Sequence, residues 1–142
     1  MLIRLLYASR ATQPIDDKVI GDILQHSRKK NLDDGITGVL CVCQGGVYMQ
    51  ALEGGRDKVN ALYARILSDP RHEAVTILTY DEITQRQFPS WSMGRVELAK
   101  VNAALVLKYS EMPAFDPLSI SGQAAQLLLE ELMDAAAIVG TG

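Results

Sequence analysis

The feature of this 142-residue sequence that most restricts its fold is the order of its strand-like and helix-like segments. Apolar, β-like runs at 2–9, 36–43, 47–54 and 74–83 are interrupted by amphipathic segments at 15–29 and 57–67, where apolar residues recur at helical spacing. A further β-like segment at 91–98 makes the order βαββαββ. Because strand–helix–strand crossovers are right-handed, this order predicts an α+β, ferredoxin-like sheet with both helices on one face.

The strands themselves indicate that the other face of the sheet is covered too. The runs LIRLL, ITGVLCV and AVTIL are apolar at nearly consecutive positions, which is typical of strands buried on both faces. The C-terminal part can supply the cover, since an apolar segment at 101–110 precedes a leucine-rich helix expected at 121–139. We therefore expect a core domain at 1–97 and a helical extension at 98–142 that packs on the sheet and mediates oligomer or partner contacts.

Composition narrows the class of function. A charged fraction of 22% and a net charge of -3 predict neither a nucleic-acid-binding face nor attraction to anionic membranes. No apolar run approaches the roughly 20 residues that span a bilayer, and the N-terminal segment lacks the pattern of a secretion signal. The two cysteines, Cys41 and Cys43, have no partners to complete a zinc site. We expect a cytoplasmic protein with buried, reduced thiols and no metal.

One polar side chain in the third predicted strand calls for an explanation. Gln50 lies between Met49 and Ala51, and a buried amide without hydrogen-bond partners costs about 1–3 kcal/mol. Strand alternation places Tyr7 and Gln50 on the side covered by the two helices, and the first and third strands of such a sheet are neighbours. We expect the phenol and the amide to lie adjacent. They either form a hydrogen bond that satisfies both groups or belong to a ligand site.

Further polar residues are expected around the same place. They lie at or just after the ends of the two predicted helices: Lys30, Asn31, Arg65, Asp69, Arg71 and His72. We expect both helix ends to flank one cleft beside Tyr7 and Gln50. Each of these residues also has an ordinary role as a solvated charge, a helix cap or a turn residue, and their spacing alone identifies no ligand.

Six motifs occur in order over about residues 1–110: LLYAS, NLDDGITGVL, YMQALEG, VNALYARILSDPRH, RQFPSWSMG and LVLKYS. Through these motifs the sequence bears a resemblance to the BLUF family, which senses blue light using flavin. It continues more loosely into the tail, as in short, single-domain members. It implies a photoreceptor that is not an enzyme and that binds FAD, with FMN and riboflavin as alternatives.

The resemblance also implies roles for individual residues. Tyr7 matches the photoactive tyrosine that gives an electron to excited flavin, and Gln50 matches the glutamine between that tyrosine and the ring. Asn31 matches the asparagine that bonds the flavin C4 carbonyl and N3. The remaining matches are Ile23 and Ile66 against the ring, Arg65 near the ribityl phosphate, Lys30, Asp69, Arg71 and His72 at the flavin edge, and Trp91 and Met93 as the pair that alternates near Gln50.

The implied mechanism is a reversible rearrangement. Light moves an electron and a proton from Tyr7 toward the flavin, and their return leaves Gln50 rotated or tautomerised, with red-shifted absorption that recovers in the dark. The change biases the 91–98 strand through Met93 or Trp91, and that strand leads to the C-terminal helices. The resemblance further implies a dimer or larger ring and a separate downstream protein partner. Tyr63 lies in the apolar stripe of its helix, which favours core packing over a role as second electron donor.

Two other classes of function fit the predicted fold. Ferredoxin-like sheets also serve as small-molecule-binding regulatory modules and as hydrolases of the acylphosphatase type. Against the hydrolase, YASRATQ contains Arg10 but no glycine-rich phosphate loop, and neither His26 nor His72 belongs to a Ser/His/Asp or Cys/His set. A purified protein that is yellow would separate the photoreceptor from both alternatives.

Overall fold

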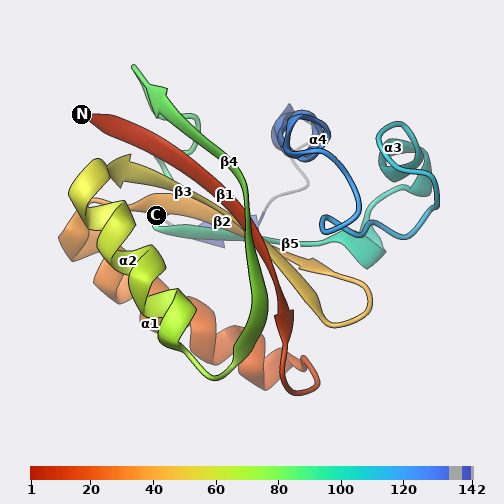
Figure 1. The fold of residues 1–142 in the computed structure, drawn as a ribbon, viewed down its shortest axis with the longest axis horizontal. Coiled ribbons are helices and arrows are strands. Elements are labelled where there is room, and N and C mark those ends of the chain that lie inside the picture. Colours follow the sequence, from red (N-terminus) through yellow and green to blue (C-terminus); the bar gives the residue numbers. More distant parts are fainter. Residues whose placement is uncertain (135–138, 142) are drawn as a thin grey trace.

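The computed structural model describes residues 1–134 and 139–141, in which a six-stranded sheet carries helices on both faces (Figure 1). The strands are β1 (Leu2–Ala11), β2 (Thr37–Cys43), β3 (Val47–Gly55), β4 (His72–Ile83), β5 (Met93–Glu97) and β6 (Val139–Thr141). The helices are α1 (Asp17–Asp34), α2 (Arg56–Ser68), α3 (Ala103–Leu107) and α4 (Gly122–Asp134), with a 3-10 turn at Leu98–Lys100.

The strand order is β4-β1-β3-β2-β5-β6. β1 pairs antiparallel with both β3 and β4, and β2 pairs antiparallel with β3, which is the predicted ferredoxin-like arrangement. β5 extends this sheet by pairing parallel to β2, and β6 then pairs antiparallel to β5. The predicted order βαββαββ is thus confirmed, whereas β6 was not predicted.

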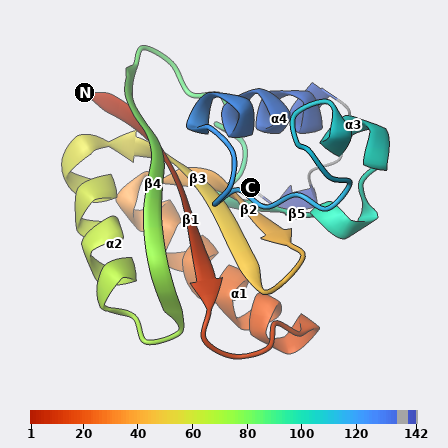
Figure 2. The ribbon, with the colours of Figure 1, turned by 45° about the vertical axis from the view of Figure 1, so that its right-hand side comes forward.

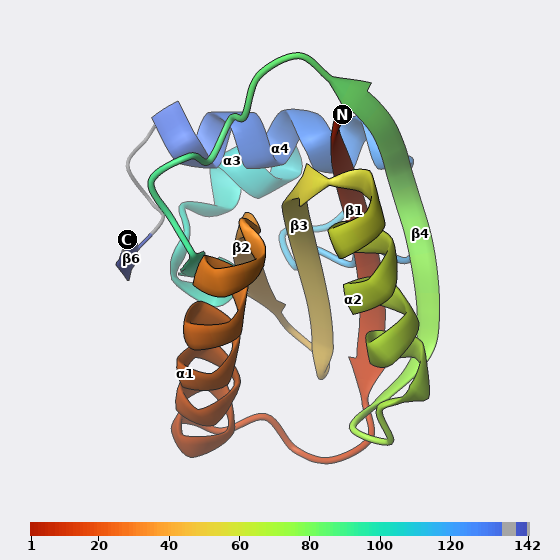
Figure 3. The same cartoon turned by 90° about the vertical axis from the view of Figure 1, so that its left-hand side faces the viewer.

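Helices α1 and α2 lie side by side on one face of the sheet (Figure 3). The apolar core beneath them includes Ile3 and Leu5 of β1, Leu52 of β3 and Ile20 and Leu24 of α1. This confirms the predicted layer, in which the apolar stripes of both helices meet the inward side chains of the strands.

Helix α1 is longer than the sequence predicted. It begins after Asp16, whose side chain accepts a hydrogen bond from the Val19 amide at 2.8 Å, and it ends at Gly35, whose φ of 68° is left-handed. The Gly35 amide bonds the carbonyls of Asn31 and Leu32. The predicted end at residue 29 was wrong because the capping geometry at Gly35 closes the helix five residues later. Lys30 and Asn31 therefore lie within the helix.

Helices α3 and α4 cover the opposite face of the sheet (Figure 2). Their core cluster joins Val106 of α3 and Leu128, Leu129 and Leu132 of α4 to the strands, together with Phe88 from the β4–β5 connection. Cys41 and Cys43 point into this cluster as free thiols, and burial raises the pKa of Cys41 to about 12. The prediction that the C-terminal helices cover the second face is confirmed.

The leucine-rich helix is shorter than predicted. It was expected at 121–139, whereas α4 spans Gly122–Asp134 and Val139 already belongs to β6. Residues 135–138 lie outside the described residues. The predicted end was wrong because the backbone at Val139–Thr141 pairs with β5, whose hydrogen-bonding groups would otherwise form the edge of the sheet.

Helix α4 approaches β4 closely at its first residue, and this contact gives a testable prediction. A Cβ atom added at Gly122 would lie 2.1 Å from the Leu78 carbonyl oxygen and 2.8 Å from Thr79 Cγ2. We expect Gly122→Ala to lower the free energy of unfolding by about 1–3 kcal/mol, since the helix must shift to relieve the overlap. Chemical denaturation measures this change. Gly21→Ala on α1, where an added Cβ meets nothing within 4 Å, is the matched control, and equal effects of the two substitutions would contradict the prediction.

Candidate functional site

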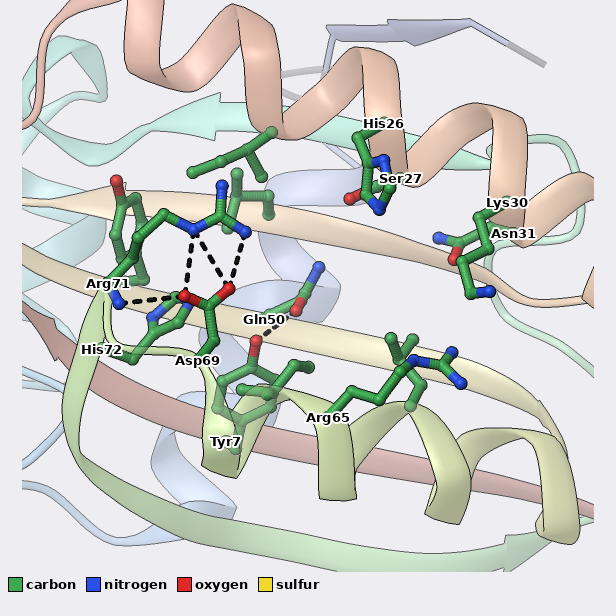
Figure 4. Close-up of a pocket in the computed structure, with 15 residues that line it drawn as sticks. Tyr7, His26, Ser27, Lys30, Asn31, Gln50, Arg65, Asp69, Arg71 and His72 are labelled. Carbon is green, nitrogen blue, oxygen red and sulfur yellow. Dashed lines mark hydrogen bonds and ion pairs between the residues drawn. The ribbon is translucent and has the colours of Figure 1, made fainter.

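A cavity of about 350 Å³ lies between α1, α2 and the sheet (Figure 4). Its volume falls in the range of roughly 300–1,000 Å³ that is typical of small-molecule sites. Its lining comes from both helices, from β1, β2 and β3, and from the segment after α2 with the first residue of β4: Tyr7, Ile23, His26, Ser27, Lys30, Asn31, Leu40, Tyr48, Gln50, Leu62, Arg65, Ile66, Asp69, Arg71 and His72.

Tyr7 and Gln50 form the polar part of the cavity floor. They face each other in the register of β1 and β3, and the Tyr7 hydroxyl donates a hydrogen bond to Gln50 Oε1. The other end of the amide is also engaged, because Gln50 Nε2 donates to Met93 Sδ at 3.4 Å. Tyr7, Gln50 and Met93 are 2%, 6% and 0% exposed, so this chain of three side chains is shielded from bulk water.

The environment of Tyr7 keeps its phenol protonated. Burial is the main reason that the pKa of Tyr7 rises well above its usual value, and the nearby Tyr63 and Asp69 raise this pKa further. The rings of Tyr7 and Tyr63 meet edge to face, with their centroids 5.7 Å apart. Tyr63 packs against the core beneath the helices and does not line the cavity.

Helix α1 supplies one wall of the cavity. Ile23, His26, Ser27 and Lys30 occupy positions i, i+3, i+4 and i+7, which lie on a single helix face. Asn31 extends this face and is 3% exposed, and its Nδ2 donates to the Ser92 carbonyl at 2.9 Å. One face of α1 therefore contacts both the cavity and the start of β5.

Helix α2 supplies the opposite wall, with Leu62 and Ile66 as its apolar part and Arg65 as its cation. Arg65 lies toward the same end of the cavity as Lys30 and Asn31 (Figure 4). Among the described residues, neither Arg65 nor Lys30 forms an ion pair with an acidic side chain. These two cations can therefore meet an anionic group.

The other end of the cavity carries Asp69, Arg71 and His72 (Figure 4). Arg71 Nη2 and Asp69 Oδ2 are 2.6 Å apart, and the hydrogen bonds from Arg71 lower the pKa of Asp69 to about 2. Burial lowers the pKa of His72, whose Nδ1 lies 3.0 Å from Ser9 Oγ. At neutral pH this end therefore presents an ion pair and a neutral imidazole.

The polar residues that were expected around one cleft at the two helix ends all line this cavity. Within it, Lys30 and Asn31 lie at the opposite end from Asp69, Arg71 and His72 (Figure 4). Ile23, Ile66 and Arg65 line the cavity as well. The segment from 69 to 72 follows α2, and because α1 and α2 are antiparallel in this topology their C-terminal ends point in opposite directions.

Of the pair Trp91 and Met93, the structure brings only Met93 to Gln50. Met93 lies in the core beneath α1 and α2, whereas Trp91 packs against the core on the other face of the sheet. The Trp91 ring stacks on Phe88 with a centroid distance of 6.4 Å. Neither residue lines the cavity directly, so Met93 contacts it through Gln50.

Sequence reasoning missed five residues as parts of the site: His26, Ser27, Leu40, Tyr48 and Leu62. For His26 and Ser27 a signal was present, since they lie three and four residues after Ile23 on the same helix face. Tyr48 shares strand parity with Gln50 and was also accessible to this reasoning. The sequence pattern predicts Leu40 and Leu62 to be ordinary core residues, and only the packing of the helices on the sheet shows that they line a cavity.

Neither a metal-binding cluster nor a membrane-spanning helix occurs among the described residues. Within residues 1–134 and 139–141 there is no group of three or more His, Cys, Asp or Glu side chains that could hold a metal ion. Over the same residues, every helix is too short or too polar to cross a membrane.

Comparison with known proteins gives a consistent result. The family model for BLUF, described as sensors of blue-light using FAD, matches residues 2–94. Photoactivated adenylate cyclase subunit beta of Euglena gracilis is 37% identical over 93 residues, which is 65% of this chain and 11% of the relative. The chain thus spans about a tenth of that relative's length.

Two solved structures match over nearly their full extent. The photo-activated state of BlsA has a TM-score of 0.82 at 32% identity, with 94% of this chain and 95% of that chain covered. The dark-state structure of the BLUF protein BlrB has a TM-score of 0.79 at 32% identity, with 95% and 96% covered. The family model covers more than half of the sequence, and the matched region contains β1, α1, β2, β3, α2 and β4 around the cavity. This chain belongs to the BLUF family of flavin-binding blue-light sensors.

Proposed function

We propose that this chain is a blue-light photoreceptor that holds a flavin between α1 and α2 and reports illumination through a rearrangement of Gln50, without catalysing the turnover of a substrate. The observation that carries this proposal is the buried hydrogen bond from Tyr7 to Gln50 Oε1 on the floor of the cavity. A phenol and an amide that merely satisfied each other would need no adjoining cavity of about 350 Å³.

The residues present fit a flavin. Ile23 and Ile66 offer apolar surfaces from opposite walls to a flat ring, and Asn31 and Gln50 offer amide groups to its polar edge. Arg65 and Lys30 offer positive charge to a phosphate, and the planar guanidinium of arginine suits phosphate oxygens. We propose FAD as the flavin, which agrees with the description of the family. FMN and riboflavin remain the alternatives that the binding experiment below distinguishes.

When bound, a flavin absorbs blue light and in its excited state accepts an electron from a nearby phenol. What this chain contributes is control of the phenolic proton. Tyr7 is neutral in the dark because burial raises its pKa, so losing an electron makes its hydroxyl strongly acidic. Gln50 Oε1 already accepts the hydrogen bond from Tyr7 Oη and is therefore the first atom on the path of that proton.

The amide of Gln50 has two arrangements that its neighbours can satisfy. In the observed one, Oε1 accepts from Tyr7 and Nε2 donates to the Met93 thioether, which is a weak acceptor. In the rotated one, Nε2 donates to the Tyr7 oxygen and Oε1 faces the thioether, at the cost of the weak N–H···S bond. The rotation also takes Oε1 away from the Tyr7 hydroxyl, so the observed arrangement is favoured in the dark and the rotated one needs new hydrogen-bond partners for these groups, which a bound flavin would supply.

We further propose that the output reaches the C-terminal helices through β5, and that those helices contact a second copy of the chain or a downstream protein partner. Met93 begins β5, and β5 continues through the turn at 98–100 toward α3. Two free thiols, Cys41 and Cys43, agree with a reducing compartment such as the cytoplasm.

The test is an absorption spectrum of the purified protein before and after blue light. We expect a flavin spectrum that shifts to the red and recovers in the dark, and we expect Gln50→Leu to bind flavin but lose the shift completely, because leucine cannot exchange hydrogen bonds. Gln25→Leu, on the exposed side of α1, is the matched control and should keep the full shift. Chromatography of the released flavin identifies FAD, FMN or riboflavin. A protein that stays colourless after incubation with all three would overturn the proposal.

A further inference from the structure

We propose that Arg28 is a positioning residue that keeps Met93, and not Trp91, beside Gln50 by holding the backbone of β5 at its first residue. Arg28 Nε donates to the Met93 carbonyl oxygen at 3.0 Å, across 65 positions of sequence. The inference rests on the proposed function, because the arrangement that Arg28 maintains is the dark-state contact between Met93 and Gln50.

Three successive carbonyl groups are held where β5 begins. The Trp91 carbonyl accepts from the Gly38 amide at 3.0 Å, the Ser92 carbonyl from Asn31 Nδ2 at 2.9 Å, and the Met93 carbonyl from Arg28. The parallel ladder between β2 and β5 starts only at Val39 and Gly94. Side chains of α1 therefore reinforce the register of the segment that carries Trp91 and Met93, in addition to the backbone bond from Gly38 of β2 and the pairing of Met93 with Thr141 of β6.

The side chains of Trp91 and Met93 are divided between the two faces of the sheet. In a regular strand, residues two apart point to the same face. Here Met93 lies in the core beneath α1 and α2, and Trp91 lies in the core beneath α3 and α4, so the backbone turns between them. To bring Trp91 to the place of Met93 in extended conformation, the segment would have to slide by two residues, about 6.6 Å. Such a movement requires the Met93 carbonyl to leave Arg28.

The chemistry of Arg28 suits this task. Its hydrogen bond to the carbonyl is charge-assisted and therefore stronger than one between neutral groups. Asn31 lies three residues further along the same helix face, so both bonds to β5 come from one turn of α1. Since Asn31 also lines the cavity, the ligand site and the start of β5 share a rigid support. A displacement of this turn would release or tighten β5 as a unit.

The single tryptophan of the chain provides a test that does not depend on flavin. We expect Arg28→Ala to change the emission maximum and the acrylamide quenching of Trp91 in the apoprotein, because the segment then leaves its packing on Phe88. In the flavin-loaded protein we expect the rate of dark recovery to change roughly tenfold, the effect of losing one charge-assisted hydrogen bond. Arg28→Lys, which keeps the charge and a donor, should restore both readings in part.

Lys29→Ala, an exposed neighbour on α1, is the matched control and should alter neither reading. Unchanged Trp91 emission and unchanged recovery in a folded Arg28→Ala protein would overturn the proposal. Should Arg28→Ala fail to fold, Arg28→Met is measured with the same readings and the same criteria, since it keeps the apolar stem of the side chain without an N–H donor. A parent protein without any light response would refute the photoreceptor function, while the fluorescence of the apoprotein would still decide whether Arg28 holds β5.

Discussion

A Tyr7→Phe protein is expected to bind flavin, remain yellow and show no red shift after blue light. The substitution keeps the aromatic ring of the cavity floor and removes only the hydroxyl that donates to Gln50 Oε1. Without that hydroxyl there is neither a proton to pass to the amide nor an oxygen to which a rotated Nε2 can donate. The loss is therefore expected to be complete, and it should not follow from impaired binding.

The measurement is the difference spectrum after illumination, together with the ratio of flavin to protein in the dark. Tyr63→Phe is the matched control, since its ring meets Tyr7 edge to face at 5.7 Å but its hydroxyl is not part of the chain from Tyr7 to Met93. We expect this variant to keep the red shift. A full red shift in Tyr7→Phe would show that the Tyr7 hydroxyl is not the photoactive one. Loss of the red shift in Tyr63→Phe, with Tyr7 intact, would contradict the assignment in the same way.

The second large effect is expected on stability, from Glu53→Ala. Glu53 is 0% exposed, and strand alternation places it on the same side of β3 as Met49 and Ala51, which belong to the core beneath α3 and α4. Its carboxylate pairs with Arg4 at 2.9 Å and accepts from the backbone amides of Gln87 and Phe88 at 2.9 and 2.7 Å. Removing one member of a buried ion pair leaves its partners unsatisfied, so we expect the free energy of unfolding to fall by about 3–5 kcal/mol.

Equilibrium unfolding in urea, monitored by circular dichroism, measures this loss. Glu82→Ala is the matched control, because Glu82 also pairs with an arginine, Arg56, but is 61% exposed on the edge strand β4. Exposed ion pairs contribute little to stability, so this variant should unfold close to the parent. Equal losses in the two variants would show that the burial of Glu53 and its bonds to the β4–β5 connection are not what makes it important.

Much of the fold could be predicted because it depends on patterns within short segments. Helical spacing in 15–29 and 57–67 and the apolar strands at 2–9 and 47–54 were enough to predict the layers and the neighbouring places of β1 and β3. Tyr7 and Gln50 followed from strand parity alone. The end of α1 was misjudged, because a helix of this composition ends where a residue such as Gly35 adopts the left-handed conformation.

The sequence by itself determined the order of the elements, the two covered faces of the sheet and the pairing of Tyr7 with Gln50, since each follows from residue spacing within or between adjacent strands. Only the tertiary structure decided that Met93 and not Trp91 reaches Gln50 and that Lys30 and His72 lie at opposite ends of one cavity. The physical reason is that these outcomes depend on contacts between segments far apart in sequence. The bond from Arg28 to the Met93 carbonyl spans 65 positions, and no local periodicity encodes it.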